Sequence, residues 1–452
     1  MRLLEITVKN FRCIKNLTFK IEEIENSSTY TLLGINESGK SSFLRAVSLI
    51  DNEDPSYPDD YFDDQEEIFI EMKYGVSNKD VQSLKSYLND SCNLDKGIFQ
   101  EIEFSEVLIQ VSFSPDSKHE KNVREIVNFK KDIFPQFTLL ENGDVVKKSS
   151  EFGEQHDFNL NDFFEVYTSD YFWDQAHKIV FWKSDPQYLL LDEIDLNAFS
   201  LNPQKVSIPL FNCFSIAGIE DVKQEILKLT SSVARQNLTD LLSENVTNHI
   251  NKVWPEHLIS IKFNINNGKI TLLVEDKGVK YKVKKTSQRS DGFRQFISFL
   301  LTLSAENLNE KLANTILLLD EPETHLHPTA QLNLLDELIK LSKNKNNNIV
   351  FFATHSNYMI DKNQIDRCYK VIKKKNDITS IERIHRIKST YAEVNYEVFG
   401  IATTDYHNEL YGFLEDEEKK KLNELPKDKE WINEKRNATE TVSLSTYIRH
   451  SI

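Results

Sequence analysis

Residues 28–50, STYTLLGINESGKSSFLRAVSLI, decide the fold of this chain. The apolar residues before Gly34 predict a buried strand, and the segment after Ser42 predicts a helix. The loop between them, GINESGKSS, matches the pattern G-x-x-x-x-G-K-[ST]. In such a loop, glycines let successive backbone N–H groups wrap around phosphates. The stretch therefore predicts a P-loop at the edge of an α/β sheet.

The side chains of this loop have different expected tasks. Lys40 is placed to reach the β- and γ-phosphates of ATP, and the Ser41 hydroxyl is placed to bind Mg²⁺. The neighbouring residues would hold the nucleotide mainly through their backbone. The predicted ATP-binding residues of the loop are Gly34, Asn36, Glu37, Ser38, Gly39, Lys40, Ser41 and Ser42.

Two further buried strands end in polar residues. ILLLDEPE, residues 316–323, carries Asp320 to the end of a strand, where open α/β sheets bind ligands. We expect Asp320, together with Ser41, to hold Mg²⁺, and Glu321 to act as the general base on the attacking water. FFATHS, residues 351–356, places His355 beyond the other strand. His355 is predicted to sense the γ-phosphate or to orient that water, so the predicted catalytic residues are Glu321 and His355.

The stretch SQRSDGFRQF, residues 287–296, predicts the start of a helix. Apolar residues recur there with helical spacing, at Phe293, Phe296, Ile297, Leu300 and Leu301. Ser290 and Asp291 are candidate caps. A helix N-terminus has unpaired N–H groups and a positive dipole, so it is suited to binding an anion. The alternative is a helix cap that binds no ligand.

The order of these motifs resembles that of an ABC-type ATPase. SDGFRQ resembles the ABC signature, which implies that Ser290 and the Gly292 backbone bind the γ-phosphate of ATP held by a second copy of the chain. The resemblance therefore implies a homo-oligomer with ATP-bridged heads. The implied contacts across the interface are Ser290, Asp291, Gly292, Arg294 and Gln295.

Two further resemblances indicate which group of ABC-type ATPases the chain is most similar to. NFRCIKNLTF, residues 10–19, resembles the opening of RecF, Rad50 and SMC heads, which implies that Arg12 approaches the nucleotide. SQRSDGFRQFISFLL, LLLDEPETHLHP and ATHSNYMID together resemble the ATPase domain of the OLD (overcoming lysogenization defect) family, over about 1–90 and 210–365. OLD nucleases also carry a Toprim domain, and its acidic pattern is not evident after His355. In this respect the chain is similar to the ATPase subunits of the antiphage systems PARIS and Septu, which pair with a separately encoded nuclease.

These features predict an α/β fold: an ABC-type P-loop NTPase head with an N-terminal β-hairpin, a mixed central sheet flanked by helices, and an inserted α+β subdomain. Residues 1–75 would form the lobe with the P-loop, and residues 76–205 the inserted subdomain. Residues 206–365 would hold the signature, Asp320 and His355. Residues 366–452 would add strands and a charged helical tail, as either a partner-docking region or a lid that completes the core.

Composition limits the classes of function. The net charge of −16, from 71 acidic and 55 basic side chains, argues against a protein that coats nucleic acid. The N-terminus alternates apolar and charged residues, unlike a signal peptide, and no apolar run approaches a membrane span. The 4 cysteines are scattered, so we expect neither a zinc site nor a disulfide framework. A cytoplasmic protein without a membrane partner is predicted.

The resulting hypothesis is a slow ATPase that uses ATP and Mg²⁺ as a switch and controls a separate effector nuclease in bacterial antiphage defence. The alternative is a DNA-maintenance ATPase of the RecF or Rad50 type that binds DNA directly, and the net acidity favours the first hypothesis. Gln65 is the candidate for a Q-loop glutamine. His325 and His327 suit a structural role as well as a functional one.

Overall fold

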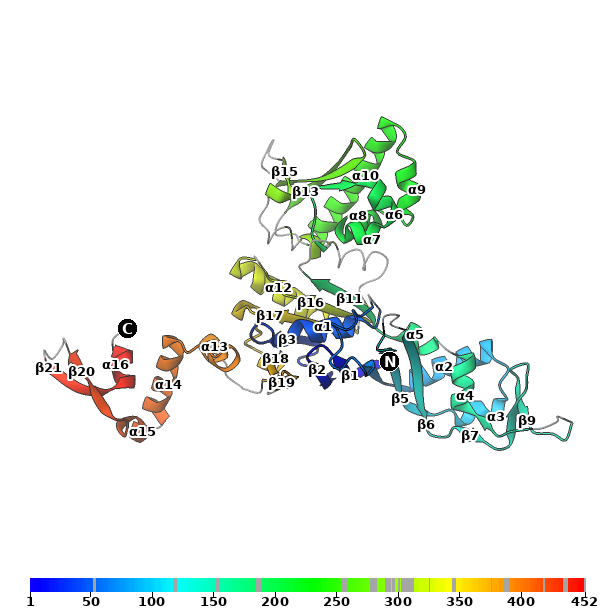
Figure 1. Cartoon of the computed structure of the whole chain (residues 1–452), viewed down its shortest axis with the longest axis horizontal. Helices are drawn as coiled ribbons and strands as arrows, with labels where there is room; N and C mark the ends of the chain where they lie inside the picture. The colour runs from blue at the N-terminus through cyan, green and yellow to red at the C-terminus, as the bar shows by residue number, and fades with distance from the viewer. Residues whose placement is uncertain are drawn as a thin grey trace.

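A computed structural model shows the chain as a central body from which three units project (Figure 1). The structure describes residues 1–51, 54–116, 120–151, 155–168, 170–183, 188–253, 258–276, 283–288, 294, 297–299, 301, 313–324, 326–343, 347–374, 376–384, 390–417, 419–433 and 438–450.

A six-stranded sheet forms the centre of the body. Its strand order is β11-β16-β17-β3-β18-β19. The pairs from β11 to β18 are parallel, and β19 is antiparallel to β18. The strands span Lys178–Lys183 (β11), Thr315–Asp320 (β16), Ile349–Thr354 (β17), Thr29–Leu33 (β3), Cys368–Lys373 (β18) and Thr379–Arg383 (β19). All residues of β3 and β17 are buried, as expected for parallel strands that are covered on both faces.

The two faces of this sheet pack against different helices. Leu318 and Phe351 share a core with helix α1 (Lys40–Ser48), which follows the P-loop. Leu317 and Leu319 point to the other face and share a core with helix α12 (Pro328–Leu341). The alternation along β16 therefore places one apolar set on each face, so that both helices are buried against the sheet.

A second, antiparallel sheet lies beside α1 and shares its core. Its strand order is β2-β1-β4-β5-β6. The strands span Arg2–Phe11 (β1), Ile14–Lys20 (β2), Ile68–Gly75 (β4), Phe104–Phe113 (β5) and Lys121–Phe129 (β6). β1 and β2 form the hairpin predicted from the alternating N-terminus. The fold class predicted from the sequence is therefore confirmed: a P-loop head with an N-terminal hairpin and a mixed central sheet flanked by helices.

Residues 76–205, predicted as one insertion, contribute to three parts of the structure: the N-terminal sheet, the central sheet and a separate unit described in the next paragraph, which contains β12, α6 and α7. The strands β5 and β6 extend the N-terminal sheet, and β11 pairs with β16 in the central sheet. Short elements pack on β5 and β6 within the same core. They are α2 (Asn78–Ser91), α3 (Lys96–Glu101), β7 (Ile133–Phe134), β8 (Phe137–Leu139), β9 (Val145–Lys147), β10 (Phe158–Asn159), α4 (Leu160–Tyr167) and α5 (Tyr171–Gln175). The range 76–205 therefore does not coincide with one structural unit.

A second unit has a core of its own, and lies above the central sheet in Figure 1. Its sheet has the order β12-β14-β13, with β15 paired to β14. The turn between β13 and β14 has positive φ at Asn267 and Gly268, which is typical of an Asn-Gly hairpin turn. The elements are β12 (Glu193–Asp195), α6 (Leu196–Leu201), α7 (Pro203–Val206), α8 (Ile208–Ile216), α9 (Val222–Leu227), α10 (Ser232–Val253), β13 (Ile259–Asn266), β14 (Lys269–Asp276) and β15 (Val283–Lys285).

The C-terminal unit projects from the opposite end of the body to the β5–β6 region (Figure 1). It contains the expected helices and also a β-hairpin that the sequence analysis missed. Its elements are α13 (Tyr391–Phe399), α14 (Thr404–Glu417), α15 (Lys419–Asn423), β20 (Lys427–Asn433), β21 (Ala438–Ser443) and α16 (Leu444–His450). Among the residues described, no helix is both long and apolar enough to cross a membrane.

Candidate functional site

The P-loop follows β3 and is held tightly against β18 and β19. A Cβ atom on Gly34 would lie 2.5 Å from the Val371 carbonyl oxygen. A Cβ atom on Gly39 would lie 2.3 Å from Thr379 Oγ1, and Gly39 has a φ of 106°. Thr379 also donates a hydrogen bond from Oγ1 to the Ser38 carbonyl, at 2.9 Å. Both glycines are therefore needed for this close approach, and Thr379 supports the loop from behind.

Lys40 lies beneath the P-loop and is 5% exposed. Its Nζ donates to the carbonyl oxygens of Gly34 (2.9 Å) and Ile35 (3.1 Å). Burial lowers the pKa of Lys40, and the carboxylates of Glu321, Asp320 and Glu323 oppose that shift. The ammonium is thus a positioned donor beside the loop that would hold the phosphates.

Ser41 and Asp320 meet at the same edge of the sheet. Ser41 Oγ donates to Asp320 Oδ1 at 2.9 Å, although the two residues are 279 positions apart in the chain. Mg²⁺ takes oxygen ligands and is commonly held by one or two protein groups together with substrate phosphates. A hydroxyl and a carboxylate side by side below a P-loop fit that requirement, so these residues suit an Mg²⁺–ATP complex.

Glu321 and His355 complete the cluster. His355 Nε2 lies 3.0 Å from Lys40 Nζ and 3.2 Å from Glu321 Oε1. Burial and the Lys40 charge lower the pKa of His355, and Glu321 opposes that shift. The ammonium of Lys40 can only donate, so Nε2 of a neutral ring accepts from it. Glu321 has a φ of 49°, and its N–H donates to Ala353 O at 3.0 Å, which fixes its backbone beside β17.

Comparison with known families agrees with this geometry. The profile of the AAA ATPase domain family matches residues 1–360. The chain belongs to the AAA ATPase domain family. This match includes the P-loop, His355 and most of the two cores of the body.

Relatives of this AAA ATPase domain protein match it over shorter stretches. An uncharacterized protein of Methanocaldococcus jannaschii is 25% identical over 170 residues, which is 36% of this chain and 42% of the relative. The Old nuclease of Escherichia phage P2 is 27% identical over 114 residues, which is 24% of this chain and 19% of that protein. The chain thus spans less than half the length of either relative.

Solved structures similar to the chain include heads of SMC proteins. The SMC head bound to the C-winged helix domain of ScpA has a TM-score of 0.41 and 14% identity, and covers 85% of this chain and 98% of its own. The SMC head domain from Thermotoga maritima has a TM-score of 0.36 and 12% identity, and covers 85% of this chain and 100% of its own.

Arg12 is anchored in the AAA ATPase domain by a residue that the sequence analysis did not single out. Its Nε donates to Asp60 Oδ1 at 2.6 Å, and its backbone N–H donates to the Asp60 carbonyl at 2.9 Å. The Asp60 side chain is 4% exposed and the Arg12 side chain 41%. Asp60 therefore supplies a buried carboxylate that orients Arg12.

The other residues that the sequence analysis singled out differ in their burial and in their contacts. Asn36 and Glu37 are exposed at the tip of the P-loop, and Ser42 is half-buried on α1. Gln65 is exposed, and its backbone N–H donates to Asp63 Oδ1 at 3.0 Å. His327 caps α12, where Nδ1 accepts from the Thr329 N–H at 3.4 Å. His327 therefore has a structural role in the described fold.

Most of the predicted signature contacts lie outside the described residues, namely Ser290, Asp291, Gly292 and Gln295, as does His325. Arg294 is described. Its Nη2 donates to the Leu190 carbonyl at 3.2 Å, and its own carbonyl accepts from Ser298 Oγ at 2.6 Å. Ile297 and Leu301 pack into the core of the second unit. Phe299, between them, packs instead in the core that the central sheet forms with α12. The described residues 297–301 therefore contact both the second unit and the central sheet.

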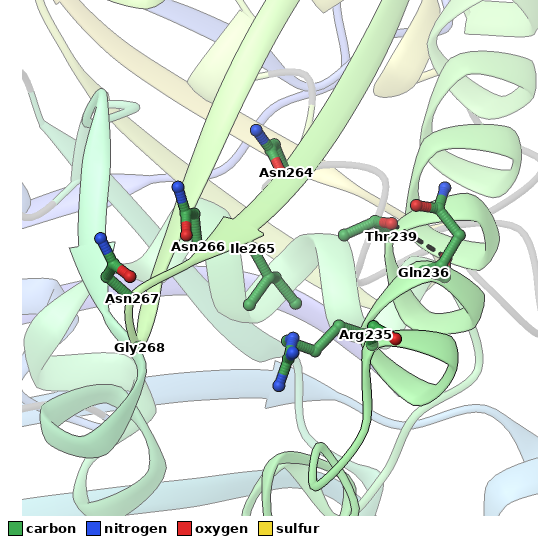
Figure 2. Close-up of a pocket in the computed structure, with 9 residues that line it drawn as sticks. Arg235, Gln236, Thr239, Asn264, Ile265, Asn266, Asn267 and Gly268 are labelled. Atoms are coloured by element: carbon green, nitrogen blue, oxygen red, sulfur yellow. Dashed lines mark hydrogen bonds between the residues drawn. The ribbon is translucent and has the colours of Figure 1, made fainter.

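A separate polar pocket of about 470 Å³ lies on the second unit, between α10 and the β13–β14 turn (Figure 2). Arg235 is the charged residue of its lining, and its Nη1 donates to the Leu229 carbonyl at 3.4 Å. The other lining residues are Ser232, Gln236, Thr239, Asn264, Ile265, Asn266, Asn267 and Gly268. None of these lining residues is a carboxylate, histidine or cysteine, so this pocket lacks the acid–base side chains that are present beside the P-loop.

Proposed function

We propose that the chain hydrolyses ATP in a Mg²⁺-dependent reaction at the edge of the central sheet. The observation that carries this proposal is the convergence of Lys40, Ser41, Asp320, Glu321 and His355, which come from three strand ends and are linked by contacts of 2.9 to 3.2 Å. Membership of the AAA ATPase domain family supports the same chemistry.

Each residue has a distinct role in the proposed reaction. Mg²⁺, when bound, would offset charge on the phosphate oxygens. Ser41 and Asp320 would hold that ion, and Lys40 would bind the β- and γ-phosphates. Glu321 would accept the proton of the attacking water, and neutral His355 would orient that water or the γ-phosphate. Arg12, held by Asp60, would approach the nucleotide from the N-terminal sheet.

We further propose that two copies pair through ATP, each completing the other's site. The stretch from Ser290 to Gln295 would contact the γ-phosphate held by the partner copy. The hydrogen bond from Arg294 to the Leu190 carbonyl supports a signature stretch that is held in place by the second unit. A Ser290→Arg variant should still bind nucleotide but should not form ATP-dependent dimers in light scattering. Dimers of that variant would remove Ser290 from the interface.

At the cellular level we propose a cytoplasmic switch that controls a separate effector, a nuclease, in bacterial antiphage defence. The similarity to part of the Old nuclease and the exposed apolar residues of the C-terminal unit support this proposal. The alternative is a DNA-maintenance ATPase of the RecF or Rad50 type. Duplex DNA that stimulates ATP hydrolysis in a salt-dependent manner would favour that alternative.

The test of the proposed site is nucleotide binding by a Lys40→Ala variant. We expect it to lose ATP binding, because Lys40 supplies the positive charge buried under the P-loop. A Lys228→Ala variant is the control, since that lysine is 66% exposed on the second unit. Isothermal titration with a non-hydrolysable ATP analogue measures both variants. Unchanged affinity in Lys40→Ala would show that ATP binds elsewhere.

A further inference from the structure

Glu323 is a buried carboxylate that the roles assigned above leave unexplained. It is 5% exposed and lies two residues after Glu321 in the turn that follows β16. The Thr324 N–H and hydroxyl both donate to the Glu321 carbonyl, at 3.2 and 2.9 Å, and close that turn. Glu323 is therefore rigidly connected to the residue proposed as the base.

One oxygen of Glu323 reaches across to the end of β17. Its Oε1 accepts a short hydrogen bond from the Thr354 hydroxyl and a longer one from the His355 backbone N–H, at 3.4 Å. The other oxygen, Oε2, is buried and has no hydrogen-bond partner among the described residues. Burial raises the pKa of Glu323 to about 7, and the hydrogen bond from Thr354 opposes the shift. Burial of a carboxylate oxygen without a hydrogen-bond partner costs free energy of folding, so the position of Glu323 needs an explanation.

The contacts continue from Thr354 around the loop that carries His355. Thr354 Oγ1 accepts from the Ser356 N–H at 2.9 Å, and Ser356 Oγ donates to Gln331 Oε1 at 2.5 Å. Gln331 Nε2 in turn donates to the Leu326 carbonyl at 2.8 Å. The residues on both sides of His355 are thus tied back to the segment that begins with Glu321.

We propose that Glu323 is a positioning residue for ATP hydrolysis. It holds the backbone at His355 against the turn at Glu321, and so keeps the imidazole Nε2 near both Lys40 Nζ and Glu321 Oε1. Glu323 itself neither touches nucleotide nor transfers a proton. This inference rests on the proposed roles of Glu321 and His355. Because catalytic geometry tolerates little displacement, loss of this tie should lower kcat more than it weakens ATP binding.

Replacement of Glu323 by alanine and by glutamine separates positioning from charge. Glu323→Gln keeps a carbonyl oxygen that accepts from Thr354 and His355, so kcat should stay within about 3-fold of the parent. Glu323→Ala removes the acceptor, and we expect kcat to fall between about 10- and 100-fold, with the ATP dissociation constant within about 3-fold. Equal kcat values for the parent and Glu323→Ala would overturn the proposal.

A double-mutant cycle shows whether Glu323 acts through His355. In a His355→Ala background, Glu323→Ala should cost no further activity, since the group that it positions is gone. A second full loss in that background would show a role independent of His355. If Glu323→Ala does not fold, Thr354→Val removes the same hydrogen bond. Thr354→Val should then lower kcat, and Thr354→Ser should restore it.

The same assays include Glu321→Gln, so that two kinds of failure can be told apart. If Glu321→Gln hydrolyses ATP at the parental rate, the proposed function of the site is wrong. If Glu321→Gln is inactive and Glu323→Ala is fully active, the proposed site stands and the positioning role of Glu323 is wrong.

Discussion

Every residue of β17 is buried, whereas α14 buries Tyr411 alone among its described residues. The central sheet has cores on both faces, formed with α1 and with α12. The C-terminal unit instead leaves large apolar side chains at least one-third exposed: Tyr396, Ile401, Leu410, Phe413, Leu425, Ile432, Leu444 and Tyr447. The sheet is thus stabilised by its own packing, whereas these apolar side chains of the C-terminal unit stay exposed.

The two regions are nevertheless connected close to the candidate site. Val394 on α13 packs in a small core with Leu33, the last residue before the P-loop. Asn357, two residues after His355, donates from Nδ2 to Asn395 Oδ1 at 2.7 Å. Both interpretations of the tail stay predictions: the contacts of α13 are those expected of a lid, and the exposed apolar residues of α14 and α16 are those expected of a docking region.

The largest expected difference between the central sheet and the C-terminal unit is the effect of a substitution on the rate of ATP hydrolysis. We expect Glu321→Gln to lower kcat by at least about 100-fold, because the amide cannot accept the proton of the attacking water. ATP binding should persist, since Lys40 and Ser41 are untouched. Phosphate release measures the rate. Glu417→Gln, on the exposed end of α14, is the matched control and should keep the parental rate. Catalysis that survives in Glu321→Gln would move the base to another residue.

The next largest difference is expected in the free energy of unfolding, when a buried and an exposed phenylalanine are each replaced by alanine. Phe351 is fully buried and stacks on Tyr30, with ring centroids 4.9 Å apart. Phe413 on α14 is 61% exposed. We expect Phe351→Ala to lower the free energy of unfolding by about 3–5 kcal/mol, and Phe413→Ala to change it by less than about 0.5 kcal/mol. Urea denaturation followed by tryptophan fluorescence compares them. Similar losses would mean that Phe413 is part of a core.

Local patterns predicted the parts of the site that depend on short stretches of sequence. The strand before Gly34 and the ends of β16 and β17 carry their own signals, namely buried apolar runs that stop at polar residues. Asp60, Glu323 and Thr379 carry no such signal, because their roles depend on contacts with Arg12, Thr354 and the P-loop that only the folded chain brings together. The β20–β21 hairpin was missed because its exposed strands lack a clear apolar alternation.

The next prediction concerns the pH dependence of stability that His177 causes at the contact between the two sheets of the body. It is 2% exposed, and its ring stacks on Tyr74 of β4 while Nε2 lies 3.0 Å from the Asn347 carbonyl. Burial lowers the pKa of His177 to about 4. Because the folded-state pKa lies below the unfolded value of 6.5, stability is present above pH 6.5 and is lost as the pH falls toward 4.

The expected loss from His177 over that pH window is about 3 kcal/mol. Urea denaturation between pH 4 and 7 measures it, as the difference between the parent and a His177→Gln variant. Subtracting the two curves removes the contributions of other titrating groups. A parallel pair of curves would show that His177 is protonated in the folded protein without cost.

The last comparison concerns one glycine in each region, and the effect in α14 is the smallest one expected. Gly412 lies inside α14, and a Cβ atom built there meets no heavy atom within 4 Å. Gly412→Ala should therefore stabilise α14 by about 0.5–1 kcal/mol, because alanine loses less backbone entropy in a helix. Gly39→Ala should instead distort the P-loop and abolish ATP binding, since its Cβ would overlap Thr379. Hydrogen exchange of α14 amides measures the first variant. Faster exchange would show that α14 packs closely against a surface of its own or of another chain at Gly412.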